Sequence, residues 1–437
     1  MLKIILHETR HIWPFNEPAR DLRIQNKPLW VWQRDVLAPY TRREITLLPG
    51  QGLPPVQGEV LIYRDNLFFD TPFMEAFLKE ARRRDYPSRV AFTLDNPAFR
   101  EHMLPLSRSY VKQGNVYLAD LWYYPRGITQ EPAEPLIVDM QVREIGYHHV
   151  PPYMARELGD LTFYVPLRGF MAIDTWVHIL LADVVMGLFA RGARFEDRLK
   201  RDPLFKLRIL FKAMLEGKQV LESSELVRIG KNCVIDPTAV IHGPTTIGDH
   251  VTIGAGVVID NCIIGNNVNI SQGCQLLLSV VGDGSFLPFR ASLFMTTFME
   301  NSTVAQNTCL QLCVVGRNSF IGAGTTFTDF NLLNKPLKAR NAYGQLEPIP
   351  LPVLGGCVGH NCRIGSGFVV YPARAIESDV VLIAREDRHV ITKDVRYEDS
   401  DHHRLRDHRH VRMYPREDEE EETPSAIGQI HKVGGTP

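Results

Sequence analysis

The chain has almost no net charge, because 49 Lys and Arg stand against 50 Asp and Glu. Such a balance argues against a general nucleic-acid-binding protein and gives no reason to expect attraction to a membrane. Residues 1–8 lack the basic region, long apolar core and cleavage site of a signal peptide. The longest apolar stretch, residues 176–190, is interrupted by His178 and Asp183 and is too short to span a bilayer. We therefore expect a buried helix there.

Cysteine is absent from both ends of the chain, and all seven cysteines lie within residues 233–362. An odd number of cysteines without a secretion signal favours reduced thiols and a cytoplasmic location. Cys309 with Cys313, and Cys357 with Cys362, have spacings that could be mistaken for a zinc site. The repeat described next would scatter these side chains, so we interpret them as packing residues.

An aliphatic residue returns at every sixth position over much of residues 229–382. One unbroken series is Ile229, Ile235, Ile241, Ile247, Ile253 and Ile259, and a later series is Val358, Ile364, Val370, Ile376 and Leu382. Neither the helical period of 3.6 nor the strand period of 2 gives a repeat of six, whereas hexapeptide repeats of a parallel β-helix do. The pattern resembles the left-handed parallel β-helix of hexapeptide-repeat transferases, in which three hexads form one triangular coil. A β-sandwich is the weaker alternative, because its strands are spaced irregularly.

The first two hundred residues read as α/β. Residues 2–6, 59–63 and 89–94 are expected strands, and residues 71–84 are an expected amphipathic helix with Thr71 as its cap. Strands that alternate with helices predict a parallel sheet that is covered on both faces.

Three segments in this region resemble the sugar-phosphate nucleotidyltransferases, which have a Rossmann-like domain. Residues 58–68 are similar to the strand that ends in the family's Gly-Asp-Asn, so Asp65 matches its magnesium ligand and Asn66 a substrate-binding position. Residues 168–176 are similar to the second metal segment, with Asp174 as the counterpart. Residues 26–29 are similar to a lysine-proline segment. The resemblance implies Mg²⁺ held by the two aspartates, which would neutralise a nucleoside triphosphate and a sugar 1-phosphate.

The phosphate-binding loop of that family is rich in glycine, but residues 6–18 contain none. Arg20, Arg23 and Lys27 are the candidate catalytic residues that would hold phosphates in its place. Whether Lys27 matches the family's catalytic lysine or a second one stays open. A catalytically silent protein that binds a sugar nucleotide is therefore a second hypothesis.

The end of the repeat region resembles the acetyltransferase half of the bifunctional uridylyltransferase/acetyltransferase family. The likeness runs without gaps over residues 305–335. Among the family's functional positions in this segment, only Lys335 keeps a side chain of a type that binds ligands. The family's catalytic histidine falls on Gln306, whose amide cannot act as a general base, and its asparagine-tyrosine pair falls on Asp329 and Phe330. We predict that glucosamine 1-phosphate is not acetylated. The other histidines of the repeats, His242, His250 and His360, are more simply explained as turn residues.

The sequence thus predicts four parts: a nucleotidyltransferase-like domain at 1–192, a connecting helix at 193–225, a left-handed β-helix at 226–385 and a polar, partly disordered tail at 386–437. The favoured function is nucleotidyl transfer from a nucleoside triphosphate to a sugar 1-phosphate. The alternatives are acyl transfer from acetyl-CoA or another acyl-CoA to a sugar or sugar nucleotide, and silent binding. Neither nucleic acid nor a membrane is an expected partner.

Three further expectations concern packing and assembly. Apolar residues follow one another at 276–278, 293–295 and 298–299, so some must point outward, which predicts a homotrimer that buries them. Residues 328–352 are too long for a simple corner and are read either as an arm that reaches a neighbouring subunit or as a disordered loop. In the connecting segment, we expect Leu204, Leu207, Leu210, Phe211 and Leu215 to pack on the base of the β-helix.

Overall fold

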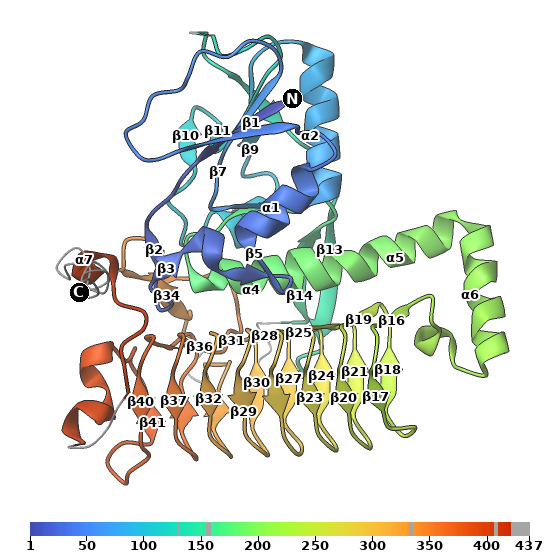
Figure 1. Cartoon of the computed structure of the whole chain (residues 1–437), viewed down its shortest axis with the longest axis vertical. Coiled ribbons are helices and arrows are strands. Elements are labelled where there is room, and N and C mark those ends of the chain that lie inside the picture. Colours follow the sequence, from blue (N-terminus) through green and yellow to red (C-terminus); the bar gives the residue numbers. More distant parts are fainter. Residues whose placement is uncertain (130, 152, 154–158, 332–334, 406–409, 421–437) are drawn as a thin grey trace, which may run out of the picture.

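The computed structural model describes the chain except for residues 130, 152, 154–158, 332–334, 406–409 and 421–437. An α/β domain lies along one side of a β-helix, and a long helix runs between the two (Figure 1). The central sheet of the α/β domain has seven strands in the order β12-β9-β11-β7-β1-β6, with β10 beside β11. Its strands are β1 (Leu2–Leu6), β6 (Arg43–Leu47), β7 (Val60–Arg64), β9 (Ser88–Phe92), β10 (Val111–Gln113), β11 (Val116–Tyr124) and β12 (Glu134–Ile137).

This sheet is mixed, which corrects the expectation of a wholly parallel one. Strand β1 pairs in parallel with β6 and β7, but β11 runs antiparallel to β7 and β9. The expected helix is α2 (Thr71–Arg84), whose cap is Asp70 and not Thr71, because the Asp70 carboxylate accepts the Phe73 N–H. The other early elements are α1 (Leu29–Leu37), β2 (His11–Ile12), β3 (Glu17–Pro18), β4 (Arg23–Ile24), β5 (Lys27–Pro28), β8 (Leu67–Phe69), β13 (Val142–His148), β14 (Leu161–Pro166) and β15 (Phe170–Ala172).

A nearly continuous helix joins the two halves of the protein. It consists of α4 (Trp176–Asp183), a π-helical turn (Val184–Phe189) and α5 (Ala190–Arg201). The span is long and apolar enough to cross a membrane, but 83% of its most apolar window is buried inside the protein. The expected buried helix at 176–190 is confirmed, and it forms part of a core shared with the β-helix.

Three parallel sheets of eight strands form the left-handed β-helix. The first sheet comprises β16 (Val227–Ile229), β19 (Thr245–Ile247), β22 (Ile263–Ile264), β25 (Val280–Val281), β28 (Thr297–Phe298), β31 (Val314–Val315), β36 (Cys357–Val358) and β39 (Ala375–Ile376). The second comprises β17 (Val234–Ile235), β20 (Thr252–Ile253), β23 (Asn269–Ile270), β26 (Phe286–Leu287), β29 (Thr303–Val304), β32 (Phe320–Ile321), β37 (Arg363–Ile364) and β40 (Val381–Leu382). The third comprises β18 (Val240–His242), β21 (Val258–Asp260), β24 (Gln275–Leu277), β27 (Ser292–Phe294), β30 (Cys309–Gln311), β33 (Thr326–Phe327), β38 (Val369–Val370) and β41 (Val390–Ile391).

The residues of the six-residue series stack on one another from coil to coil. Ile235 lies in register with Ile253, and Ile253 with Ile270, and all face the interior of the prism. Cys313, Cys357 and Cys362 are buried free thiols, in agreement with the packing interpretation. The hexapeptide prediction is therefore confirmed at the level of individual side chains.

The outer face of the first sheet and its corner with the third sheet are covered by the protein's own α/β domain, and Val314, Cys357 and Ala375 of the first sheet lie in the shared cluster. Met295, Met299 and Leu312 belong to the same buried cluster as the core of that domain, and Leu278 and Phe294 pack against it. These include outward residues from which a trimer was predicted, whereas Leu276, Leu293 and Phe298 face the prism interior. Burial within one chain already removes these residues from water, so they give no reason for a trimer, and the trimer itself stays a prediction.

The described part of the insertion at 328–352 contacts the α/β domain of its own chain. Strands β34 (Lys338–Arg340) and β35 (Leu346–Pro348) form a hairpin, and Ala342 N donates to Leu106 O of the α/β domain at 3.0 Å. The interpretation as an arm toward a neighbouring subunit is not supported by this contact, and residues 332–334 lie outside the described part.

The connecting segment corrects a further expectation. Helix α6 (Pro203–Glu216) follows α5 and packs on the chain through Ile209 and Ala213. The five apolar residues expected to cover the base of the β-helix are instead 45% to 78% exposed: Leu204, Leu207, Leu210, Phe211 and Leu215.

The structure describes the tail over residues 386–405 and 410–420. Its elements are two 3-10 turns (Tyr397–Asp399 and Asp401–Arg404) and α7 (Glu417–Glu420), while His408 and residues 421–437 fall outside the described residues. Arg416 binds the buried carboxylate of Glu377 at 2.6 Å, which fastens the tail to the last coils.

A buried aspartate sits where the long helix meets the first sheet. Asp183 is fully buried and accepts hydrogen bonds from Thr297 Oγ1 at 2.8 Å and from the Gln25 backbone N–H at 2.6 Å. Burial raises the pKa of Asp183 to about 7 from its ordinary 3.8, although these hydrogen bonds favour the charged form.

Asp183 makes stability depend on pH. The folded state keeps this proton up to about pH 7, while the unfolded chain releases it near pH 4, so stability falls as pH rises through that window. We expect Asp183→Asn, which resembles the protonated form, to remove this pH dependence. In the unaltered protein, it should lower the free energy of unfolding by about a few kcal/mol in total. Urea unfolding of both proteins between pH 4 and 8 measures it, and equal slopes would contradict the prediction.

Candidate functional site

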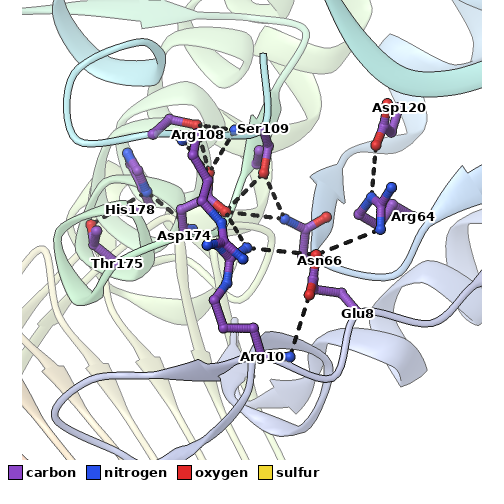
Figure 2. A network of polar contacts seen from close by, with 12 residues as sticks. Glu8, Arg10, Arg64, Asn66, Arg108, Ser109, Asp120, Asp174, Thr175 and His178 are labelled. Carbon is purple, nitrogen blue, oxygen red and sulfur yellow. Dashed lines mark hydrogen bonds and ion pairs between the residues drawn. The ribbon is translucent and has the colours of Figure 1, made fainter. Parts of the chain in front are cut away.

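Asp174 lies at the centre of a polar network at the edge of the α/β domain (Figure 2). Strand β15 pairs with β8, and Ile173 N donates to Asn66 O, so Asp174 is placed beside Asn66. The Oδ1 atom accepts from Ser109 Oγ at 2.8 Å, Asn66 Nδ2 at 3.3 Å and Arg10 Nη2 at 3.4 Å. The Oδ2 atom accepts from Ser107 Oγ at 2.5 Å and from the backbone N–H groups of Arg108 and Ser109 at 3.1 and 3.2 Å.

Asp65 is held by a second network at the same edge. It follows β7, and its carboxylate is bound by His7 Nδ1 at 2.7 Å, Arg20 Nη1 at 3.1 Å and the Glu8 N–H at 2.8 Å. The loop after β1 joins the two networks, because it supplies both these contacts to Asp65 and the Arg10 contact to Asp174. Segments that are far apart in the sequence therefore meet at this edge.

The donor set does not fit a magnesium ion. Each oxygen of Asp174 already accepts three hydrogen bonds, and a carboxylate has about four lone-pair sites in all. Mg²⁺ needs open carboxylate oxygens and several waters, and the neighbouring guanidinium groups of Arg10 and Arg20 would repel it. Within the described ranges, no group of three or more His, Cys, Asp or Glu side chains is arranged to hold a metal. Positive charge in this network comes from arginine.

The remaining candidate residues are spread over the molecule. Lys27 is half exposed and pairs with Asp35 at 2.6 Å. Arg23 binds Glu300 of the β-helix at 2.6 Å, which makes it an interdomain contact. Gln306 and Lys335 are exposed on the β-helix side. The structure therefore joins Asp65, Asn66, Asp174 and Arg20, whereas the catalytic and substrate-binding roles of the candidates stay predictions.

Sequence reasoning missed the residues that saturate the aspartates. The signal was present in the glycine-free loop, where His7, Glu8 and Arg10 replace small residues by charged ones. Glu8 lies 3.6 Å from Arg10 and 3.5 Å from Arg64, so the loop neutralises its own charges. A cavity of about 430 Å³ lies beside Arg10 and Asp174, and residues of the β34–β35 hairpin line another of its walls.

A second cavity, of about 330 Å³, lies between the β13–β14 hairpin and the β-helix. Its polar lining comprises Tyr147, His148, Gln311 and Asp329, and its apolar lining includes Phe294, Leu312, Phe330 and Val353. Burial raises the pKa of the Asp329 carboxyl, and the nearby His148 acts against that rise. Burial also raises the pKa of Tyr147, whose buried hydroxyl has no hydrogen-bond partner among the described residues. We call this the interdomain cavity.

The histidines of the repeats are engaged elsewhere. His360 is buried, and its Nε2 lies 3.1 Å from Glu17 Oε1 while its Nδ1 accepts the Arg317 N–H at 2.9 Å. Burial lowers the pKa of His360. His250 occupies a turn with a φ of 58°, and His242 lies 3.3 Å from Asp260. These contacts agree with the structural interpretation of all three. His148 lines the interdomain cavity with Asp329, and His11 lines the cavity beside Asp174.

Comparisons with known proteins bear on the β-helix. Residues 227–261 match the family model described as bacterial transferase hexapeptide, six repeats. No curated protein sequence matches the chain. Among solved structures, it is similar to the acetyltransferase domain of PglB from Neisseria gonorrhoeae in complex with acetyl coenzyme A, at 17% identity and a TM-score of 0.18. That match covers 39% of this chain and 64% of the length of the other, and a likeness this distant carries no functional argument.

The Asp174 network is expected to stabilise the fold without magnesium. Removal of the carboxylate in Asp174→Ala leaves Arg10 and five other donor groups without their acceptor, which should lower the free energy of unfolding by on the order of 3 kcal/mol. Denaturant unfolding measures this loss. Asp35→Ala is the matched control, because an exposed ion pair contributes about 1 kcal/mol or less. A rise in melting temperature with millimolar Mg²⁺ that Asp174→Ala abolishes would contradict the assignment.

Proposed function

We propose that the protein is an acyltransferase that uses an acyl thioester such as acetyl-CoA and acts in the interdomain cavity. The observation that carries this proposal is a histidine and a carboxylate, His148 and Asp329, in one apolar-lined cavity against the β-helix. The match of the first coils to a hexapeptide transferase model supports a transferase. Enzymes of acyl transfer need a base and an oxyanion donor, and both side-chain types line this cavity, with His148 at a solvent-exposed position.

In the proposed reaction, His148 accepts the proton of an acceptor hydroxyl or amine while that group attacks the thioester carbonyl. The carbonyl oxygen becomes an oxyanion, and the unpartnered Tyr147 hydroxyl is the candidate donor to it. Collapse of the intermediate breaks the C–S bond, and the thiolate takes the proton from His148. Asp329 stabilises the imidazolium formed in between, since opposite charges favour each other strongly in a partly buried site.

The acceptor class follows from the lining. Phe294, Leu312 and Val353 provide surface for an acyl chain or for the face of a sugar ring. Asp329 would oppose a phosphate at this position, so the acceptor is a sugar or sugar nucleotide whose reacting end is uncharged. Nucleotidyl transfer is the weaker candidate, because the saturated aspartates and the glycine-free loop leave no place for a metal-bound triphosphate.

We also propose that the protein assembles through the second sheet of the β-helix. Phe286 and Phe320 are 41% and 40% exposed on its outer face, and each pairs with Thr303 of the strand between them. Phe289, at the adjacent corner, is 58% exposed. A homotrimer would remove this apolar stripe from water.

The acyl-transfer proposal is tested by thiol release from acetyl-CoA with a panel of sugars and sugar nucleotides. We expect His148→Ala to lower kcat/KM by about 10²-fold or more, because the general base is lost. The adjacent His149→Ala is the matched control, since His149 pairs with Asp160 and does not line the cavity. Glucosamine 1-phosphate should give no turnover, with or without Gln306→His. Full activity of His148→Ala would remove this residue from the mechanism.

The assembly proposal predicts a mass of three chains by light scattering. Phe286→Glu combined with Phe320→Glu should give a single-chain mass, because charges would replace the apolar contact. Leu94→Glu, at a residue exposed to a similar degree on the α/β domain, should leave the mass unchanged. A single-chain mass for the unaltered protein at micromolar concentration would refute the trimer.

A further inference from the structure

Helix α6 stands apart from the body of the protein. It projects beyond the first coil of the β-helix, at the end opposite the C-terminal tail (Figure 1). The helix is capped at both ends. The Asp202 side chain accepts the Phe205 N–H at 3.0 Å at the N-terminus, and Gly217 ends the last turn with a φ of 62°. Neither cavity is lined by a residue of α6. Its sequence therefore serves something other than the two sites described above.

One face of α6 is apolar and exposed. Its six residues are Leu204 (78%), Leu207 (63%), Leu210 (45%), Phe211 (56%), Met214 (68%) and Leu215 (67%). At 100° per residue these six positions fall within an arc of about 140°. The opposite stripe, with Ile209 and Ala213, packs on the chain. So many large apolar side chains on one exposed helix face mark an interaction surface.

The borders of this face are basic. Lys206 lies next to Leu210 on one side of the arc, and Arg208 and Lys212 follow Leu215 on the other. The one acidic residue of the helix, Glu216, accepts a hydrogen bond from Ser224 at 2.5 Å on the packed side. An apolar face between cationic borders is the pattern of a helix that lies in a membrane interface.

The charge of this end differs from that of the whole chain. Residues 198–231 contain nine Lys or Arg and four Asp or Glu, although the complete chain has a net charge of −1. Three of the four acidic groups serve the fold: Asp202 caps α6, Glu216 binds Ser224 and Glu225 pairs with Arg208 at 2.8 Å. A local excess of positive charge attracts anionic lipid headgroups over a Debye length.

We propose that α6 docks the protein on the surface of an anionic lipid bilayer. The apolar side chains enter the boundary between headgroups and acyl chains, and Lys206 and Lys212 extend to the phosphates along their aliphatic stems. A second copy of the chain fits this face less well, because face-to-face packing of two α6 helices would bring their basic borders together. Among the described residues, only Arg208 and Lys212 of these borders have an acidic neighbour in the same chain, Glu225 at 2.8 Å and Glu216 at 3.9 Å.

The test is co-sedimentation of the full chain with vesicles of phosphatidylglycerol and phosphatidylcholine, compared with vesicles of phosphatidylcholine alone. We expect at least tenfold stronger binding to the anionic vesicles, weakened severalfold by high salt. Leu207→Glu with Phe211→Glu should reduce binding at least tenfold, because charge replaces apolar contact at exposed positions that do not hold the fold together. Lys206→Gln with Lys212→Gln should reduce binding and its dependence on salt.

The matched control is Val111→Glu with Leu48→Glu, two residues that are each 54% exposed on the α/β domain, and it should bind as the unaltered protein does. Melting temperatures verify that all variants are folded. Equal sedimentation with neutral and anionic vesicles, or none with either, would overturn the proposal. A loss of oligomeric mass in the Leu207→Glu, Phe211→Glu variant without vesicle binding by the parent would assign the face to a second copy instead.

Discussion

The arrangement of the protein depends on the burial of one face of the β-helix by its own chain. A hexapeptide prism has three outer faces, and the first sheet presents Val280, Thr297, Val314 and Cys357, all of them buried. The helix at 176–201 lies over this face and joins both halves in one apolar core. Because hydrophobic stabilisation follows the apolar area removed from water, the two halves stabilise each other. Polar clamps such as Asp183 with Thr297 fix their relative position.

Buried charges in the α/β domain are balanced by groups from the same chain. Two carboxylates placed at one sheet edge repel each other unless cations or hydrogen-bond donors compensate them. Here a loop of bulky charged residues supplies the compensation, with Arg10 on Asp174 and with Arg20 and His7 on Asp65. A metal would have supplied the same charge while leaving room for phosphates. The charged side chains of this loop therefore satisfy the hydrogen-bonding capacity of both carboxylates within the chain itself.

Much of the fold could be predicted from local pattern, and the failures share one cause. The period of six identifies the prism because every coil repeats the same inward position, and helix 71–84 follows from its own amphipathic spacing. Which partner covers an outward apolar residue is not encoded locally. The pattern at Met295 and Met299 predicts contact with a neighbouring subunit, whereas the chain covers both residues itself. The pattern of α6 predicts packing on the base of the β-helix, whereas its apolar residues face outward. Periodicity identifies an apolar face but does not identify its partner.

The same limit explains why the candidate catalytic histidine was not found by position. Along the β-helix itself, the segment around Gln306 and Asp329 carries no residue that can act as a base. The interdomain cavity combines Asp329 from that segment with His148 and Tyr147 from a hairpin about 180 residues earlier in the chain. A site made in this way requires the α/β domain to be docked on the first sheet. The burial that holds the two halves together is then also what assembles the chemistry, so loss of the docking contact would remove the site while leaving every one of its residues in place.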